Sequence, residues 1–347
     1  MELLEMGTGG RKMKFKNKLA QIASSLRDTN TSRALFTLLI FFVASTIFVN
    51  RFFTLNNLIN VLRQSALVFS FSIGMAIAML LAGLDLSIGA VAAYSGVLAA
   101  SLISNGYIVL GIIVGLLVGI TCGLISGVII SKYKVPPFIM TFGMMKIASG
   151  LALNFTKGES IYGLSDKFRW IGVGTIGLIP APLIICTVLL ILLAYFGKRS
   201  VLGRRIYAVG SNRNAARFSG IPCERTLMIG YALSGLFSGI AGLMFVARLG
   251  SAEGIMGDGW PLQAIAACVL GGVSFAGGEG TIQGAAIGAL CVAIMYNVLN
   301  LLGVSPSWQQ FLIGFVIIFV ISIDFIKSQI IRKKNISNKL RTMQKTA

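Results

Sequence analysis

Long apolar runs separated by short polar stretches form the pattern of this chain. A helix needs about 20 apolar residues to cross a bilayer, and backbone groups inside lipid must be paired within their own segment. The runs therefore predict an all-α fold, a polytopic membrane helix bundle of about ten spanning helices. We place these helices at 34–50, 65–83, 86–104, 107–131, 136–155, 179–197, 227–247, 261–275, 281–302 and 308–326.

The domain organisation follows from these runs. The predicted transmembrane domain is 34–326, between a basic N-terminal tail at 1–33 and a basic C-terminal tail at 327–347. The first apolar run follows a long basic leader without a small-residue cleavage site after it, which favours an uncleaved helix over a signal peptide. The run at 136–155 is the least regular, because Lys146 interrupts it. Composition agrees with a membrane protein, since only 12% of the residues are charged, against about 25% in soluble domains.

The net charge of +19 matters here through its distribution. Lysine and arginine gather in 11–33, at Lys132 and Lys134, in 198–225 and after Ile326. With ten helices, all four clusters fall on one side of the membrane and hold 23 of the 30 basic residues. The positive-inside rule assigns that side to the cytoplasm, so both termini are predicted to be cytoplasmic. The tails then contact anionic lipid, and the charge does not indicate nucleic-acid binding.

The sequence excludes several kinds of chemistry. It contains no histidine, which removes His-based metal sites and Ser-His-Asp catalysis. Its five cysteines show no paired spacing and are typical of packed thiols. It also lacks a G-x-x-x-x-G-K-[ST] phosphate loop. We therefore expect no cofactor in this chain, and ATP that drives transport would be bound by another subunit.

One carboxylate, Asp85, stands alone in the otherwise uncharged stretch 65–104. An ionised carboxylate in the middle of a lipid-facing helix costs at least about 2.5 kcal/mol. Gly83 before it and Ser87 after it predict a helix break, in which Asp85 caps the first turn of the next helix. The same break can line the passage of a transporter, because non-helical backbone is tolerated beside a water-filled cavity.

A second stretch resembles this break. The segments "AGLDLSI" at 82–88 and "AGGEGTI" at 276–282 share an acid and a hydroxyl at the same spacing. Duplicated halves of a transporter leave such a similarity, with the substrate path between them, although a chain rich in Gly and Ala also produces it by chance. The candidate residues of the translocation path are Asp85, Ser87, Glu279 and Thr281.

Glycines recur every four residues on two of the predicted helices. Small residues at this spacing let two helix backbones approach closely within lipid. We expect them to pack helices within the chain, and a seam between two copies is the alternative. These glycines are Gly111, Gly115, Gly119, Gly123 and Gly127 on one helix, and Gly280, Gly284 and Gly288 on the other.

The polar segment 198–226 is the longest one between two predicted spans on the basic side. Ser211 or Asn212 can cap a short helix in it, and Gly220 followed by Pro222 ends that helix. We expect this helix to dock into a groove of a soluble partner, and a solvated basic loop is the alternative. Its small apolar face consists of Ala215, Ala216 and Phe218.

Six motifs follow one another between about residues 35 and 325. They are "FFTLNNLINVLRQSA", "AGLDLSIGAVAA", "GRRIYAVGSNRNAARFSGI", "VARLGSAEG", "LQAIAACVLGGVSFAGGEGTIQGAAIGAL" and "NVLNLLGVS". In these motifs the chain resembles the permease subunits of bacterial ATP-binding-cassette (ABC) importers for ribose, other monosaccharides and small polyols. This group is related to the branched-chain amino acid permeases.

The resemblance implies a type II ABC importer-like fold in the bacterial inner membrane, with two permease subunits, identical or different. It also implies two cytoplasmic ATPase subunits, which bind ATP and Mg²⁺, and an external solute-binding protein that delivers the sugar. The motif that couples such permeases to the ATPase falls on the polar segment already described. Its residues are Gly210, Ser211, Asn212, Ala215, Ala216, Arg217, Phe218, Ser219 and Gly220.

Two departures from the ribose permease pattern leave the exact sugar open. Pro261, Leu262 and Gln263 stand where an acidic residue is common, and Glu279 stands where ribose permeases can carry lysine. A branched-chain amino acid permease is the nearest alternative. An ion-coupled secondary transporter would need an acid–base relay, which the isolated Asp85 does not provide. A non-transporting scaffold would leave the helix break and the docking segment without a role.

Overall fold

The computed structural model describes residues 29–315, 318 and 322, so most of the two predicted tails lies outside the described residues. The apolar helices of the bundle are α2 (Thr29–Phe48), α3 (Leu55–Leu80), α4 (Ile88–Ser104), α5 (Ile108–Lys132), α6 (Pro137–Thr156), α8 (Ala181–Arg199), α11 (Cys223–Leu249), α12 (Trp260–Leu270) and α13 (Ile282–Leu301). The short elements are α7 (Asp166–Val173), β1 (Thr175–Ile176), β2 (Ile179–Pro180), α9 (Val201–Ser211) and α10 (Arg213–Phe218). A further helix begins at residue 306 and is described to residue 315.

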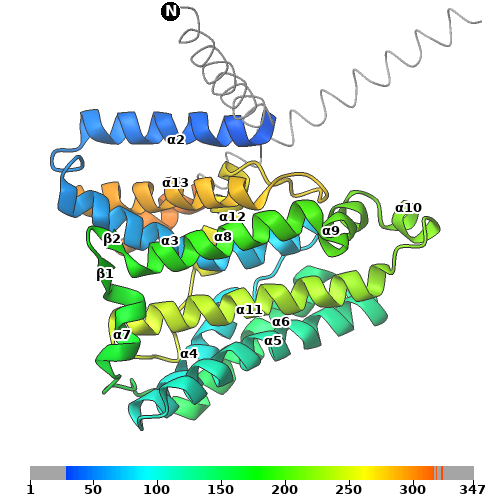
Figure 1. Ribbon diagram of the computed structural model, residues 1–347, viewed down its shortest axis with the longest axis horizontal. Coiled ribbons are helices and arrows are strands. Elements are labelled where there is room, and N and C mark those ends of the chain that lie inside the picture. The colour runs from blue at the N-terminus through cyan, green and yellow to red at the C-terminus, as the bar shows by residue number, and fades with distance from the viewer. Residues whose placement is uncertain (1–28, 316–317, 319–321, 323–347) are drawn as a thin grey trace, which may run out of the picture.

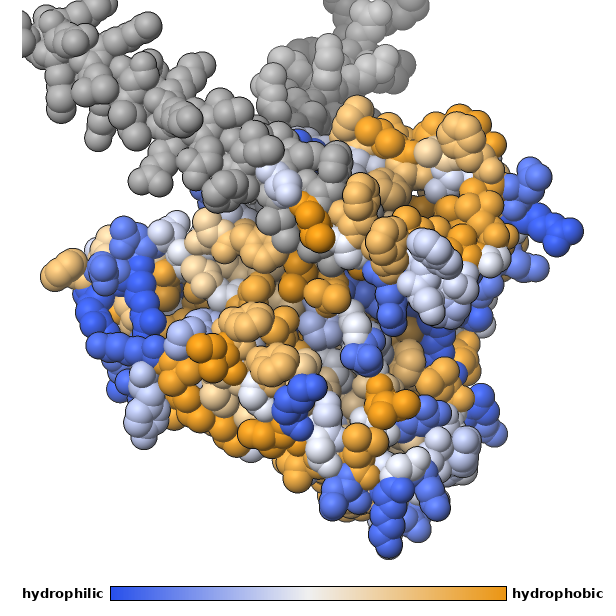
Figure 2. Space-filling model, turned by 180° about the vertical axis from the view of Figure 1, so that it is seen from behind, coloured by the Kyte–Doolittle hydropathy of each residue, from blue (hydrophilic) through white to orange (hydrophobic). Residues whose placement is uncertain are grey.

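The described part is the all-α membrane bundle that the sequence predicts. Helices α3, α5, α6, α11 and α13 are long and apolar enough to cross a membrane, and α2, α4, α8 and α12 are apolar but shorter. Most of the helix axes run from the end that carries α10 toward the end that carries α7 and the β1–β2 hairpin (Figure 1). Figure 2 shows hydrophilic side chains gathered toward the two ends and a mainly apolar surface between them. The sequence did not predict α7 or the hairpin.

Several helix boundaries differ from the prediction, and those of α3 and α12 have a clear structural cause. Helix α3 begins at Leu55, ten residues before the predicted start. Arg63 is accommodated within it, because its Nη2 lies 3.5 Å from the carbonyl oxygen of Val173 at the end of α7. Helix α12 ends at Leu270, five residues before the predicted end, since the chain turns at Gly272 with a φ of +78°.

The predicted helix break near Asp85 is confirmed. Helix α3 lies at the centre of the bundle, and its side chains from Ser65 to Leu80 are buried. It ends at Leu80, Ala82 takes a left-handed conformation with a φ of +57°, and α4 begins only at Ile88. Non-helical backbone at this depth is tolerated because it is buried in protein or faces a cavity.

The same packing arrangement occurs twice in the chain. Helix α3, the segment after it, α4 and α5 form one set, and α11, the segment after it, α12 and α13 form the other. Helix α5 packs against α11 as α13 packs against α3, and α4 packs against α5 as α12 packs against α13. Helices α3 and α11 are antiparallel, since Gly74 lies beside Ser234 and Leu81 beside Gly230. This pattern is typical of inverted repeats.

The repeat corrects the prediction that 276–282 is the counterpart of 82–88. The segment 82–88 lies between α3 and α4, whereas 276–282 lies between α12 and α13. In the repeated arrangement, the counterpart of the first break is the segment 250–259, between α11 and α12. The shared letters of the two motifs therefore do not mark equivalent positions.

Most of the glycines spaced every four residues pack helices within the chain, as expected; Gly280 is an exception, since it precedes α13 and takes a φ of +119°. A Cβ atom on Gly119 would overlap the carbonyl oxygen of Gly235 on α11, and one on Gly123 would overlap that of Tyr231. On α13, a Cβ atom on Gly284 would overlap the backbone of Gly271, directly after α12. In lipid such close backbone approach supplies the packing that drives helix association.

We expect Gly119→Val to destabilise the bundle by about 1–3 kcal/mol, because the added side chain must push α5 away from α11. The matched control is Gly197→Val in α8, where a Cβ atom would meet no other atom within 4 Å. The control carries the same small gain of helix propensity, because valine ranks above glycine, without the overlap. Thermal unfolding of the two purified variants measures the difference, and equal melting temperatures would contradict the packing assignment.

Candidate functional site

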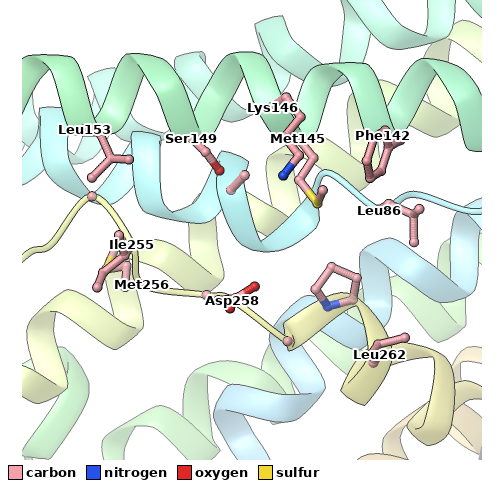
Figure 3. A pocket seen from close by; sticks show the side chains of 15 residues that line it. Leu86, Phe142, Met145, Lys146, Ser149, Leu153, Ile255, Met256, Asp258 and Leu262 are labelled. Atoms are coloured by element: carbon pink, nitrogen blue, oxygen red, sulfur yellow. The ribbon is translucent and has the colours of Figure 1, made fainter. Parts of the chain in front are cut away.

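A cavity of about 710 Å³ lies between α6, the start of α4 and the segment that leads into α12. Most of its lining is apolar, and three polar side chains point into it (Figure 3). Lys146 and Ser149 come from α6, and Asp258 comes from the segment before α12. Pro261 and Leu262, two of the residues that depart from the ribose permease pattern, also line it. The cavity thus combines a few polar groups with apolar walls, as small-molecule sites commonly do.

The position of Lys146 indicates that the cavity is not filled with lipid. Lys146 is the tenth residue of the 20-residue spanning helix α6, and it is exposed on the surface of the chain. Its Nζ lies 5.6 Å from the centre of the Phe142 ring, and no carboxylate of the described residues lies within 4.0 Å of it. A charged group facing hydrocarbon at this depth costs at least about 2.5–3.5 kcal/mol. This face of α6 therefore meets water or another protein surface.

Asp85 lies directly behind the cavity. Its side chain is 1% exposed, while the next residue, Leu86, lines the cavity. The Oδ1 atom accepts hydrogen bonds from the backbone N–H and the hydroxyl of Ser87, at 3.0 and 2.6 Å, and Oδ2 accepts one from the hydroxyl of Ser234, at 2.6 Å. Ser234 lies near the middle of α11. The carboxylate therefore joins the break after α3 to the opposite long helix.

This geometry corrects the prediction that Asp85 caps the first turn of α4. Helix α4 begins at Ile88 with Ser87 at its N-cap, and the Ser87 side chain makes no capping bond. Asp85 pairs the N–H of Ser87, one position before the helix, so it stabilises the turn that leads into α4. Gly83 is needed in the same turn, because a Cβ atom there would overlap the buried hydroxyl of Tyr231.

The other two candidates for the translocation path do not join Asp85. The starts of the two similar motifs do meet, since a Cβ atom on Gly277, the second residue of one motif, would lie 2.5 Å from that of Ala82, the first residue of the other. Beyond this contact the segments diverge: Glu279 is exposed, and the hydroxyl of Thr281 caps α13 by accepting the N–H of Gly284 at 2.9 Å. The structure therefore does not bring the four candidate residues together.

Substitution of Asp85 separates hydrogen bonding from charge. We expect Asp85→Asn to keep most of the stability and transport, because the amide still offers one oxygen and the hydroxyl of Ser234 can rotate to accept from its NH₂ group. Asp85→Leu leaves buried donors unpaired, each costing about 1–3 kcal/mol. Folded yield and uptake measure both effects. Full activity of the leucine variant, or complete loss in the asparagine variant at normal yield, would contradict this account.

The predicted docking segment projects from the end of the bundle opposite α7 (Figure 1). Asn212 caps α10 as predicted, because its Oδ1 accepts the N–H of Ala215 at 3.0 Å. Arg217 of α10 pairs with Glu224 at the start of α11, with an N–O distance of 3.3 Å. Of the nine residues of the predicted coupling motif, Gly210 and Ala216 are buried, and the others are exposed: Ser211, Asn212, Ala215, Arg217, Phe218, Ser219 and Gly220.

The apolar face predicted for this helix is divided. Ala216 is 5% exposed and packs with the main core of its own chain, whereas the ring of Phe218 is 92% exposed. The prediction that Ala216 contacts a partner is therefore wrong, because one side of a two-turn helix must rest on the bundle that carries it. Phe218 is the apolar side chain that α10 presents outward.

A continuous set of contacts joins this end to the cavity. Gly210, at the end of α9, packs so closely on α3 that a Cβ atom would overlap the carbonyl oxygen of Leu80. The same carbonyl accepts the N–H of Gly278 at 3.0 Å. Leu80 is followed by the break that contains Asp85 and by Leu86, which lines the cavity.

The sequence did not single out Lys146, Ser149 and Asp258 as site residues. The signal that could have found the site was Lys146 itself, a charge that interrupts a predicted span. No group of three or more His, Cys, Asp or Glu side chains that could hold a metal ion occurs in the part of the chain that the structure describes.

Comparison with known proteins gives consistent relatives. Residues 57–321 match the family model described as "Branched-chain amino acid transport system / permease component". The ribose import permease protein RbsC of Escherichia coli K12 is 37% identical over 287 residues, which cover 81% of this chain and 89% of that protein. RbsC of Bacillus subtilis is 42% identical over 275 residues, which cover 78% of this chain and 85% of that protein. The D-allose transport system permease protein AlsC of Escherichia coli K12 is 36% identical, covering 79% and 84%.

No solved structure matches the chain. The family model nevertheless covers most of its length, and several relatives align over more than three quarters of both chains. The spanning helices and the inverted arrangement agree with a transport protein. The chain belongs to the family of permease components described for the branched-chain amino acid transport system.

Proposed function

We propose that the chain is the membrane-spanning permease subunit of an ATP-driven ABC importer for a small neutral sugar. The relatives named for ribose and D-allose transport support this substrate class. The sequence has no phosphate-binding loop of its own, so separate ATPase subunits would bind ATP and Mg²⁺. An extracytoplasmic solute-binding protein would deliver the sugar. On this proposal the chain is a transport subunit and not itself an enzyme.

The observation that carries the proposal is the cavity beside α6. A sugar offers several hydroxyl groups that exchange hydrogen bonds with charged and polar side chains, and an apolar face that packs on apolar walls. Lys146, Ser149 and Asp258 supply the polar groups for these hydrogen bonds. Phe142 and Leu262 contribute to the apolar walls. The opposite charges of Lys146 and Asp258 balance, which favours a solute without net charge.

The uncovered face of α6 supports a second permease subunit. Exposed residues on this helix include the charged Lys146. Gly143 and Gly150 have no atom within 4 Å of where a Cβ atom would be, unlike the glycines of α5 that pack against α4 and α11. Small residues mark helix interfaces in membranes. A second copy, or a related subunit, would cover this face and enclose the cavity as a path between the two subunits.

The orientation follows from charge. The basic residues of α9, α10 and the end of α5 lie at the end where α2 begins (Figure 1). We assign that end to the cytoplasm of a bacterial inner membrane by the positive-inside rule, which also places both termini inside. The exposed Phe218 then faces the cytoplasmic ATPase subunits, and the end of the bundle that carries α7 faces the outside, where the solute-binding protein would dock. The basic tails at 1–33 and 327–347 would contact anionic lipid.

Uptake into proteoliposomes tests the function. The permease is reconstituted with its ATPase and loaded with internal ATP, and labelled ribose, allose, arabinose or leucine is added with the binding protein. We expect sugar uptake that requires hydrolysable ATP and persists when a proton gradient is collapsed. Uptake of leucine alone would favour the branched-chain amino acid alternative, and loss of uptake with the proton gradient would favour an ion-coupled transporter.

A further inference from the structure

Three arginines gather around α7. Helix α7 lies at the end of the bundle opposite α10 (Figure 1). Arg63 of α3 reaches the last carbonyl oxygen of α7, at 3.5 Å. The backbone of Arg248, near the end of α11, packs against the last turn of α7, and the side chain of Arg169, on α7 itself, lies against the glycine that follows α11. Three helices thus hold these guanidinium groups in one region of the surface.

Little negative charge offsets this cluster. Within the described residues, Asp166 is the one carboxylate within 4.0 Å of any of the three; it lies 3.7 Å from Arg169, and its side chain is 99% exposed. Arg63 and Arg248 are close enough for their like charges to repel. The Nε atoms of Arg63 and Arg169 are buried and have no hydrogen-bond acceptor in the described part of the chain. Unpaired buried donors and unbalanced like charges are both costly, so the cluster is suited to an anion.

The surroundings of the arginines are apolar. Exposed apolar side chains beside them are Trp170, Val173, Ile176, Leu178 and Ile179. A groove of about 130 Å³ opens between α3, α8 and α13, and its lining begins at Leu62, next to Arg63. Tryptophan and arginine beside apolar groups at the ends of spanning helices are typical of the depth at which lipid headgroups lie.

We propose that Arg63, Arg169 and Arg248 bind the phosphate of an anionic phospholipid. An arginine guanidinium can donate two parallel hydrogen bonds to the oxygens of one phosphate group. A lysine ammonium is only a point charge, so three arginines are better suited to bind phosphate. One acyl chain lies in the groove beside Leu62, and the glycerol region covers the exposed residues of α7 and the hairpin. Free inorganic phosphate shares the headgroup chemistry but leaves the groove and the apolar side chains uncovered.

The test compares full-length protein in nanodiscs of phosphatidylcholine with protein in discs that also contain phosphatidylglycerol. We expect phosphatidylglycerol to raise the melting temperature of the unmodified protein by selective binding to the folded state. In Arg63→Gln and Arg248→Gln this gain falls to less than about half, and Arg63→Lys recovers part of it because the charge remains. Native mass spectrometry is expected to show one fewer retained phosphatidylglycerol in each glutamine variant.

Arg213→Gln is the matched control, since it removes the same charge at the opposite end of the bundle. We expect phosphatidylglycerol to raise the melting temperature of this variant as much as that of the unmodified protein. Equal gains in Arg63→Gln, Arg248→Gln and the control would overturn the proposal, because the lipid would then act only through the net charge of the chain. An equal gain from inorganic phosphate in phosphatidylcholine discs would also overturn it, in favour of a soluble anion. Both readouts are independent of sugar uptake.

Discussion

Phe218→Asp is expected to abolish solute uptake while leaving the membrane bundle folded. In the proposed importer, the exposed ring of Phe218 fills an apolar groove of the ATPase subunit. The aspartate would place an unpaired charge in that contact, and burying such a charge costs several kcal/mol. Because the Phe218 side chain is 92% exposed in the single chain, its replacement removes almost no packing from the permease itself. Co-purification with the ATPase subunit and stimulation of ATP hydrolysis are expected to fall together.

Two variants control this result. Phe218→Leu keeps an apolar side chain and should retain most of the coupling, and Arg213→Gln at the start of α10 should change little. Ala216→Asp is unsuitable as a test, because Ala216 is buried in the core of its own chain and the charge would disturb the fold. Normal assembly and uptake by Phe218→Asp would show that α10 is only a solvated connection.

Lys146→Glu is expected to reduce sugar uptake by tenfold or more without loss of folded protein. Hydrogen bonds from a charged group contribute about 1.5–3 kcal/mol, and about 1.4 kcal/mol corresponds to a factor of ten in binding. The change also places two negative groups, Glu and Asp258, in one mainly apolar cavity. The side chain of Lys146 is exposed, so its replacement leaves the packing of α6 against α4 intact.

The double variant Lys146→Glu with Asp258→Lys separates charge balance from shape. It restores one positive and one negative group in the cavity, so we expect partial recovery of uptake. Ile147→Leu, at an exposed position next to Lys146 on α6, serves as the control for general effects on the helix. Uptake rates are measured with saturating binding protein. Unchanged uptake in Lys146→Glu would show that the sugar does not pass this cavity.

Much of the fold can be predicted from the sequence, because membrane helices are specified locally. A helix in lipid must satisfy its own backbone, so the length and polarity of each run nearly fix its extent. The break near Asp85 was predictable for the same reason, since an isolated carboxylate flanked by glycine and serine is costly inside a continuous span. Likewise, glycines spaced every four residues indicated close helix packing, and the structure identifies their partners on α11, α4 and α12.

The candidate site was not predictable in the same way, because its residues are distant in sequence. Lys146 and Asp258 face one cavity only because α6 and the segment before α12 are brought together by the inverted packing of the two sets of helices. The interaction of Asp85 with Ser234 likewise joins residues 149 positions apart. A similarity between short motifs pointed instead to Glu279, which the structure leaves exposed and away from Asp85.

The sequence by itself therefore determined the membrane environment, the positions of most of the long apolar helices, the break and the position of α10, all of which depend on local polarity and backbone pairing. Tertiary structure decided which side of each helix is used. It buried Ala216 and exposed Phe218, and it gathered Arg63, Arg169 and Arg248 from three helices. The physical reason is that nearly every run here is apolar on all sides, so hydrophobic periodicity cannot tell a face that packs on protein from a face that meets lipid or a passage.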